Sequence, residues 1–211
     1  MTKHGLIILM KQLLQFIIDT IYPPSKDALL VRDFYEDDID NLFNIRQIDG
    51  ITCLTNFKDR NTKALIHETK FHNNKKSTLI LGKLLAKYLE KTNLGKSCVF
   101  IPIPLSKARH RARGHNQVDE VLKKALGNLN IQPNTKILRR TTDTKPQANL
   151  PREERLKNVK GAFSITDTNA VYGKRIVLVD DVLTTGATLN EAKATLLPHS
   201  PTSITCIALA H

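Results

Sequence analysis

Residues 176–188 read Ile-Val-Leu-Val-Asp-Asp-Val-Leu-Thr-Thr-Gly-Ala-Thr, and this stretch decides the fold. Its first four residues form an apolar, β-branched-rich run, which is typical of a strand covered on both faces of a parallel sheet. Asp180 and Asp181 follow at the carboxyl end of the strand, where open α/β sheets bind ligands. The turn after them offers small side chains and a row of N–H groups at a helix start, which suits a phosphate; its residues are Thr184, Thr185, Gly186, Ala187 and Thr188. The alternative is an acidic strand–turn–helix corner that binds no ligand.

Strand-like and helical stretches alternate around this segment. Apolar patterning predicts strands at 97–103, 137–138, 161–165, 175–179 and 203–209, and helices at 116–126 and 188–197. Such alternation predicts an α/β fold with a parallel sheet and right-handed crossovers. Upstream, helices are expected at 62–71 and 78–89, with a solvated turn at Lys75-Lys76 and one or two short strands within 48–57. Residues 106–115 and 141–159 are predicted to be basic loops.

The charge of the chain is strongly positive and unevenly distributed. The 211 residues carry a net charge of +12, and residues 96–160 hold 15 Lys and Arg against 5 Asp and Glu. Such a stretch suits nucleic acid, a diphosphate with a sugar phosphate, or a solvated surface. Aromatic residues are only 5% and there is no Trp, so platforms that stack single-stranded bases are not evident.

Cysteine and histidine spacing argues against a metal ribbon. Cys53, Cys98 and Cys206 are far apart and form no Cys-x-x-Cys pair, which predicts neither a disulfide framework nor zinc and favours a cytoplasmic setting. The histidines at 67, 72, 110 and 115 match no zinc pattern either. We therefore expect no zinc.

The N-terminal run 6–22 is apolar but interrupted by Lys11, Gln12, Gln15 and Asp19. Its helical spacing predicts an amphipathic helix that packs on the domain or a partner, with a membrane surface as the alternative. It is too short and too polar for a firm membrane assignment, and Pro23-Pro24 ends it. We expect residues 1–50 to be this helix and an extension, and residues 51–211 to be the main domain.

The motifs together resemble the competence-protein F (ComF) family of type I phosphoribosyltransferase-like proteins. Matching stretches are Pro-Ile-Pro-Leu-Ser at 102–106, Arg-Gly-His-Asn-Gln at 113–117, Gln147 with Arg155, Asn158 and Gly-Ala-Phe at 161–163, and the segment 176–188; Lys70 stands at the family's usual lysine. The resemblance implies a parallel-sheet type I phosphoribosyltransferase fold with helices on both faces and a small N-terminal helical or hood extension. One departure is that Ser25 follows Pro-Pro where relatives often begin a cysteine-rich zinc ribbon, so that subdomain is expected to be lost.

The resemblance also implies a site for phosphoribosyl diphosphate (PRPP) and Mg²⁺. Asp180 and Asp181 would be the catalytic and metal-linked pair on the ribose, and the turn 184–188 would hold the 5′-phosphate. The basic segment after the strand would bind the diphosphate, through Ser106, Lys107, Arg109, Arg111 and Arg113. A mobile lid at 141–159 would close over the sugar and exclude water, with Lys145, Gln147, Arg152 and Arg155 as its candidates. For each arginine, a solvated basic surface is the alternative.

Three functions remain open on the sequence. The first is phosphoribosyl transfer to an unknown acceptor, the second is non-catalytic sensing of PRPP or a nucleotide, and the third is an accessory role with single-stranded DNA beside a DNA-uptake helicase, as the resemblance implies. Thr184 stands where purine-salvage relatives carry a carboxylate, which disfavours hypoxanthine or guanine salvage. No Gly-x-x-x-x-Gly-Lys exists, which excludes a P-loop. Homodimer formation is left open.

Overall fold

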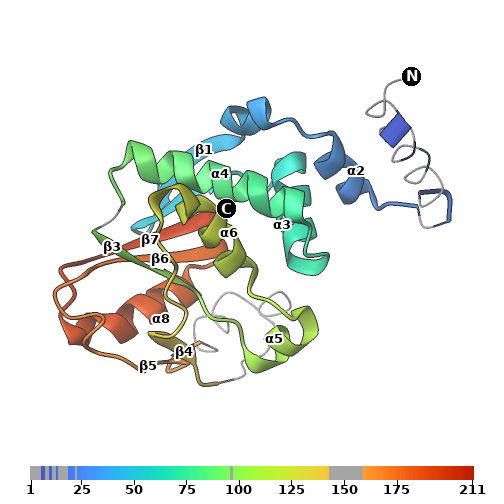
Figure 1. The fold of residues 1–211 in the computed structure, drawn as a ribbon. Helices are drawn as coiled ribbons and strands as arrows, with labels where there is room; N and C mark the ends of the chain where they lie inside the picture. Colours follow the sequence, from blue (N-terminus) through green and yellow to red (C-terminus); the bar gives the residue numbers. More distant parts are fainter. Residues whose placement is uncertain are drawn as a thin grey trace.

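The computed structural model describes residues 23–95, 97–142 and 159–211, together with residues 6, 7, 10, 13 and 19–21. Its centre is a five-stranded sheet in the order β1-β2-β7-β6-β3 (Figure 1). The strands are β1 (Phe43–Ile48), β2 (Ile51–Thr55), β7 (Ser203–Ala210), β6 (Arg175–Val182) and β3 (Cys98–Pro102). The last four run parallel, and β1 is an antiparallel edge strand paired with β2.

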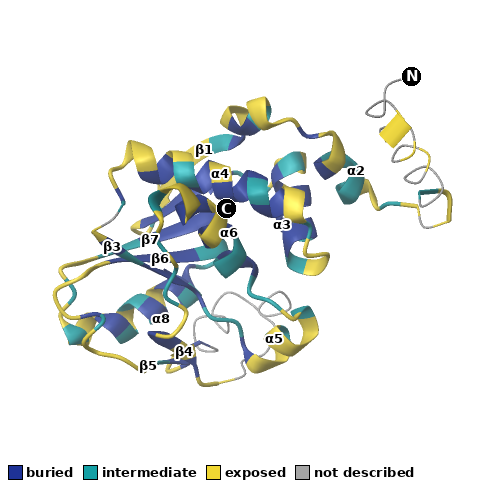
Figure 2. Ribbon diagram, viewed as in Figure 1, coloured by how far each residue is buried: buried dark blue, intermediate teal, exposed yellow. Residues whose placement is uncertain are grey.

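Helices cover both faces of this sheet (Figure 1). On one face lie α3 (Arg60–Phe71), α4 (Lys75–Lys91) and α6 (Gln117–Leu126), and on the other lies α8 (Ala187–Leu196). The alternation along β6 explains this arrangement, because Val177 and Val179 pack into the first core whereas Ile176 and Leu178 pack into the second. All four are almost fully buried (Figure 2). The predicted α/β class with a parallel sheet is confirmed.

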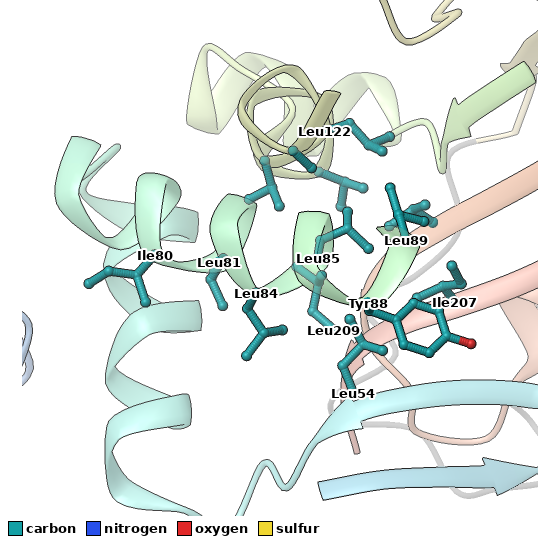
Figure 3. Packing of buried hydrophobic residues seen from close by; sticks show 14 of the residues in the cluster. Leu54, Ile80, Leu81, Leu84, Leu85, Tyr88, Leu89, Leu122, Ile207 and Leu209 are labelled. Atoms are coloured by element: carbon teal, nitrogen blue, oxygen red, sulfur yellow. The ribbon is translucent and has the colours of Figure 1, made fainter. Parts of the chain in front are cut away.

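The packing of α4 between the sheet and α6 forms the centre of the larger core (Figure 3). Leu84 and Leu85 are completely buried there, with Leu122 of α6 beside them. Gly82 allows the two helices to approach closely, because a Cβ at that position would lie 2.4 Å from the Cβ of Lys124. Truncating such a leucine to alanine typically costs about 2–5 kcal/mol.

Two of the predicted loops are wrong in part. Residues 106–115, expected to be a basic loop, contain the helix α5 (Lys107–Arg113). Ser106 starts this helix by accepting a hydrogen bond from the N–H of Arg109 at 3.3 Å, and Gly114 ends it at φ +73°. Lys75-Lys76, expected to be a turn, is the first turn of α4, because Asn74 caps that helix. In both places a polar cap outweighs the missing apolar periodicity.

The first two strands after α6 depart from the expected parallel arrangement. β4 (Leu138–Arg140) and β5 (Phe163–Ile165) form a separate antiparallel pair. Ile137, Leu138 and Phe163 pack with α8 in the second core. Short 3₁₀ turns follow two of the helices, at Gly127–Leu129 (η2) and Leu197–His199 (η4).

The N-terminal segment contributes α2 (Lys26–Asp33) and the 3₁₀ helix η1 (Glu36–Leu42) before β1. The sheet therefore begins at residue 43, ahead of the expected domain start at residue 51. The described positions among 6–21 are helical, and their apolar side chains are exposed rather than packed on the domain; these are Leu6, Ile7, Met10, Leu13 and Ile21. Across the described chain, no helix combines the length and the apolar character that a membrane span requires.

Candidate functional site

A cavity of about 490 Å³ opens where β3 and β6 end. Its size is typical of sites for small molecules. Eight of the predicted site residues line it, from two separate segments of the chain: Arg109, Arg113, Asp180, Asp181, Thr184, Gly186, Ala187 and Thr188. The cavity thus lies at the carboxyl end of the parallel sheet, where the position of the two aspartates predicted a site.

Asp181 is held from both sides. The Nζ of Lys70 lies 2.9 Å from its Oδ1, and the side-chain amide of Gln117 donates a hydrogen bond to its Oδ2. Only 13% of the Asp181 side chain and 17% of the Lys70 side chain are exposed. Burial would raise the pKa of Asp181, but the charge and hydrogen bond of Lys70, with Gln117 and Arg113, outweigh burial and lower this pKa below its usual value. Asp181 is therefore ionised and fixed in position.

Asp180 differs from its neighbour. Its Oδ1 accepts a hydrogen bond from the N–H of Asp181 at 2.9 Å. Burial and the adjacent charge of Asp181 nevertheless raise the pKa of Asp180 to about 7. The two carboxylates share one cavity wall and cannot both ionise readily, because their charges repel each other. A bound cation would relieve this repulsion.

The turn after β6 is shaped for an anion. Gly186 precedes α8 with φ +74°, and a Cβ there would lie 3.2 Å from both Asn190 Nδ2 and Ile51 Cδ1. Gly186 has no side chain to cap this ten-residue helix, and Ala187 and Thr188 of its first turn line the cavity. The N–H groups of a helix start and the positive end of the helix dipole favour negative charge at this point.

The basic helix α5 has two faces. Arg109 and Arg113, one turn apart, line the cavity. Lys107, His110 and Arg111 are exposed, and Lys107 and Arg111 are not among the cavity residues. The four basic residues predicted from the sequence therefore divide by helical position, which the expectation of a loop did not anticipate.

The Arg-Gly-His-Asn-Gln stretch at 113–117 joins this helix to the acids. Arg113 donates to the Oε1 of Gln117 at 2.9 Å, and Gln117 in turn donates to Asp181. The ring of His115 contacts the carbonyl of Thr69 at 3.1 Å, which ties the segment to α3. Asn116 caps α6 and also donates to the carbonyl of Ile103 at 3.0 Å. The motif thus positions both a cation and an amide against the acidic pair.

The wall opposite the turn comes from residues that the sequence did not single out. Ile66, His67, Phe71 and Lys63 come from α3, and Phe57 comes from the loop before it. Arg113 lies over the Phe71 ring, 5.2 Å from its centroid. Arg140 of β4 also lines the cavity, although its side chain is mostly buried and lies 5.5 Å from the Phe163 ring centroid. Helical spacing on α3 was visible in the sequence, but nothing local indicated that its 63–67–70–71 face would meet β6.

Other predicted residues lie elsewhere. Ser106 is buried as the cap of α5, and Thr185 accepts a weak hydrogen bond from the N–H of Ala187 at 3.4 Å. Neither is among the cavity residues. The lid candidates Lys145, Gln147, Arg152 and Arg155, with Asn158, lie outside the described residues.

Comparison with known proteins agrees with the motifs. Residues 67–211 match the family described as "Phosphoribosyl transferase domain". Competence protein F of Haemophilus influenzae is 36% identical over 134 residues, 60% of this chain and 58% of that protein. DNA utilization protein YhgH of Escherichia coli K12 is 31% identical over 144 residues, 66% of this chain and 63% of that protein. This chain therefore spans about three fifths of the length of these curated relatives.

Two further matches cover a smaller part of this chain or are weaker. Competence protein ComFC of Bacillus subtilis is 35% identical over 102 residues, 48% of this chain and 39% of that protein. A solved structure of the allosteric regulatory enzyme of purine biosynthesis matches with a TM-score of 0.40 at 18% identity, covering 69% of this chain and 30% of that one. The family resemblance drawn from the motifs is confirmed.

Proposed function

Because this chain belongs to the phosphoribosyl transferase domain family, we propose that its cavity binds PRPP together with Mg²⁺. The 5′-phosphate would lie against the start of α8 at 184–188. Asp180 and Asp181 would hold the ribose hydroxyls and the hydrated metal ion. Arg109 and Arg113 would face the diphosphate. A cytoplasmic setting and a lid formed by residues 141–159 are parts of the same proposal.

One observation carries this proposal: a pair of carboxylates and the start of α8 line one cavity, eight positions or fewer apart in the sequence. The phosphate and the ribose hydroxyls of PRPP would therefore each contact complementary groups, and these two sets of groups are neighbours. The raised pKa of Asp180 supports a cation in the bound state, since a divalent ion would stabilise both carboxylates in their charged form. Mg²⁺ would supply charge neutralisation for the departing diphosphate.

The aromatic wall supports a transfer reaction rather than storage of PRPP. In such a transfer, the bond from C1 to the diphosphate oxygen breaks, its electron pair leaves with the diphosphate, and an acceptor nucleophile forms the new bond to C1. Phe57, His67 and Phe71 offer a surface against which a planar acceptor would stack. If the protein binds PRPP but consumes no acceptor, it is instead a non-catalytic sensor of PRPP.

Calorimetry on the full-length chain tests the binding step. We expect saturable binding of PRPP that requires Mg²⁺, with weaker binding of ribose 5-phosphate and of diphosphate alone, and a rise in Tm with ligand concentration. An unchanged Tm at millimolar PRPP with Mg²⁺ would contradict the proposal. Release of diphosphate in the presence of a mixture of nucleobases then separates an enzyme from a sensor.

The outer face of α5 favours a second function, binding of single-stranded DNA. Lys107, His110 and Arg111 are exposed on one short helix and are turned away from the cavity. Relatives are named for competence and DNA utilization, and a DNA-uptake helicase would be the corresponding partner. Each phosphate contact that is lost should reduce the salt dependence of binding. Filter binding of an oligonucleotide at several salt concentrations should therefore give a shallower slope for Lys107→Ala with Arg111→Ala; equal slopes would exclude this face.

A further inference from the structure

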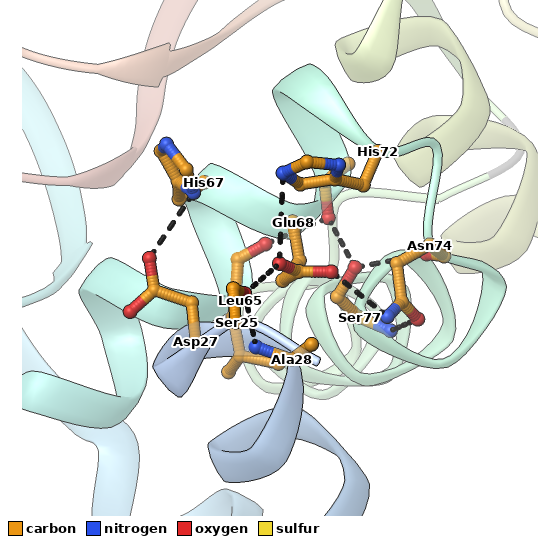
Figure 4. A network of polar contacts seen from close by, with 10 residues as sticks. Ser25, Asp27, Ala28, Leu65, His67, Glu68, His72, Asn74 and Ser77 are labelled. Carbon is orange, nitrogen blue, oxygen red and sulfur yellow. Dashed lines mark hydrogen bonds and ion pairs between the residues drawn. The ribbon is translucent and has the colours of Figure 1, made fainter. Parts of the chain in front are cut away.

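A cluster of metal-ligating side chains lies where α3 meets α2 and the start of α4 (Figure 4). It consists of His67, Glu68 and His72, each of which offers one ligand atom, and these atoms lie within 4.8 Å of one another. His67 and Glu68 belong to α3, and His72 is the residue that ends the helix. The three are therefore held by one rigid element and its cap.

Glu68 is the fixed member of this cluster. Only 3% of the residue is exposed, and its two oxygens accept hydrogen bonds from Ser25 Oγ and Asn74 Nδ2, each at 3.2 Å. Among the described residues, its recorded ion-pair partner is His72, whose Nε2 lies 3.9 Å from Oε1. A buried carboxylate with two neutral donors retains unused lone pairs and an uncompensated charge, which a cation would satisfy.

His67 offers a nitrogen that is not satisfied by hydrogen bonding. Its Nδ1 is shielded from solvent and makes no hydrogen bond to any described residue. The Oδ2 of Asp27 on α2 lies 3.1 Å away, as an ion-pair partner outside hydrogen-bonding geometry. The His67 and His72 rings are close, with centroids 5.8 Å apart. Two imidazoles and a fixed carboxylate thus converge on one point, with a second carboxylate beside them.

We propose that His67, Glu68 and His72 bind a divalent transition-metal ion, with Zn²⁺ as the reference ion. Two histidines and a carboxylate form a recognised three-ligand set for zinc, which leaves a fourth position open. Imidazole nitrogens select such ions over Mg²⁺, which prefers oxygen ligands. Ligands at about 2.0–2.2 Å lie roughly 3.3–3.5 Å apart in a tetrahedron, so the ligand atoms must move inward. His72 can supply this movement because 54% of its side chain is exposed.

An ion at this position would affect two other parts of the molecule, the contact between α2 and α3 and the wall of the cavity. Ser25 and Asp27 on the α2 side contact Glu68 and His67, so an ion there would stabilise the docking of α2 onto α3. His67 also lines the cavity, on the wall opposite the phosphate turn. The ion would therefore fix the orientation of one side chain at the acceptor wall. This site is independent of PRPP and of the acidic pair.

Titration of the tag-free, full-length chain with Zn²⁺ after chelator treatment tests the proposal. We expect one equivalent to bind with a Kd in the micromolar range or tighter, with at least a tenfold loss of affinity in His67→Gln and in His72→Gln. Co²⁺ should give visible absorption bands of a nitrogen- and oxygen-ligated site, and these bands should be lost in both variants. Millimolar Mg²⁺ should not compete.

Matched controls keep the test specific. His211→Gln removes another exposed histidine and should bind Zn²⁺ like the natural chain. His72→Gln should leave the metal-free Tm unchanged, which excludes misfolding as the cause of lost affinity. Equal Zn²⁺ affinity in the natural chain and in both cluster variants would overturn the proposal, as would the absence of binding at micromolar Zn²⁺. Neither result would bear on PRPP.

Discussion

The two walls of the cavity are built in opposite ways. The β6–α8 wall places Asp180, Asp181 and the turn at 184–188 within a single short segment, and it presents carboxylates and N–H groups. The α3 wall collects Lys63, His67 and Phe71 across a helix, with Phe57 before it, and presents rings and cations. Phosphate and ribose chemistry requires polar groups at fixed distances, which a contiguous turn provides. The residues of the α3 wall need no such fixed distances from one another. Each of them can therefore be substituted without disturbing the others.

From this difference we expect one wall to govern the binding of PRPP and the other to govern the choice of acceptor. We expect substitutions on the β6–α8 wall to weaken PRPP binding whichever acceptor is present. Substitutions on the α3 wall should instead change what reacts with the bound sugar. Lys70 is the exception, because it belongs to α3 but pairs with Asp181, and so it links the two walls.

The largest expected effect comes from neutralising the acidic pair. Asp180→Asn and Asp181→Asn should each weaken Mg²⁺-PRPP binding by about 100-fold or more, roughly 2.7 kcal/mol, since each removes a charge that in our proposal holds the ribose and the metal ion. Isothermal calorimetry measures this loss. Asp37→Asn, an exposed acid on η1 outside the cavity, is the matched control and should bind normally. Unimpaired binding in both pair variants would place the ligand elsewhere.

The turn itself can be tested with two glycines. Gly186 and Gly50 share a positive φ, +74° and +76°, but only Gly186 has neighbours within 4 Å of a new Cβ. Gly50→Ala should cost about 1 kcal/mol of unfolding free energy from backbone strain alone, and Gly186→Ala about 2 kcal/mol or more. Urea denaturation measures both. PRPP affinity should fall only in Gly186→Ala, and equal affinities in the two variants would show that the turn does not bind the ligand.

The raised pKa of Asp180 predicts a pH dependence of stability. Between its ordinary pKa near 4 and its folded value of about 7, the folded state binds more protons than the unfolded state, so stability falls as pH rises through this window. The natural chain should lose about 3 kcal/mol relative to Asp180→Asn from pH 4 to pH 7. Denaturation at several pH values measures the difference between the two proteins. Parallel pH profiles would mean that Asp180 titrates normally.

The smallest effect separates the faces of α5. Arg109→Ala and Arg113→Ala should each weaken PRPP binding by about five- to tenfold, consistent with one lost charge-assisted contact of roughly 1 kcal/mol. Arg111→Ala lies on the outer face and should change PRPP affinity less than twofold. Calorimetry on the three variants compares them directly. Equal losses in all three would indicate a general charge effect rather than a site.

The sequence predicted the wall whose signals are local. The apolar run before Asp180, the acids and the small residues after them are contiguous, so the strand, the turn and the position of the cavity followed from one segment. The α5 helix was missed because its seven residues carry no apolar stripe; only the caps at Ser106 and Gly114 mark it. The four predicted basic residues of this helix were consequently treated as equivalent.

The opposite wall depends on tertiary packing that no local pattern encodes. Lys70 reaches Asp181 across more than 100 residues of sequence, and Arg140 enters the cavity from a three-residue strand. Histidine spacing alone gave no metal site, because Glu68 completes the cluster from within a helix and Asn74 and Ser25 fix it from other segments. Contacts between distant segments must be known before such groups can be assembled.

The central claim is that the β6–α8 wall binds a phosphorylated pentose, and a crystal of the full-length chain soaked with Mg²⁺ and PRPP tests it most directly. The account predicts the 5′-phosphate at the N–H groups of 184–188, the ribose hydroxyls beside Asp180 and Asp181, and the diphosphate toward Arg109 and Arg113. Density for the ligand at another surface, or an empty cavity at saturating PRPP, would contradict it.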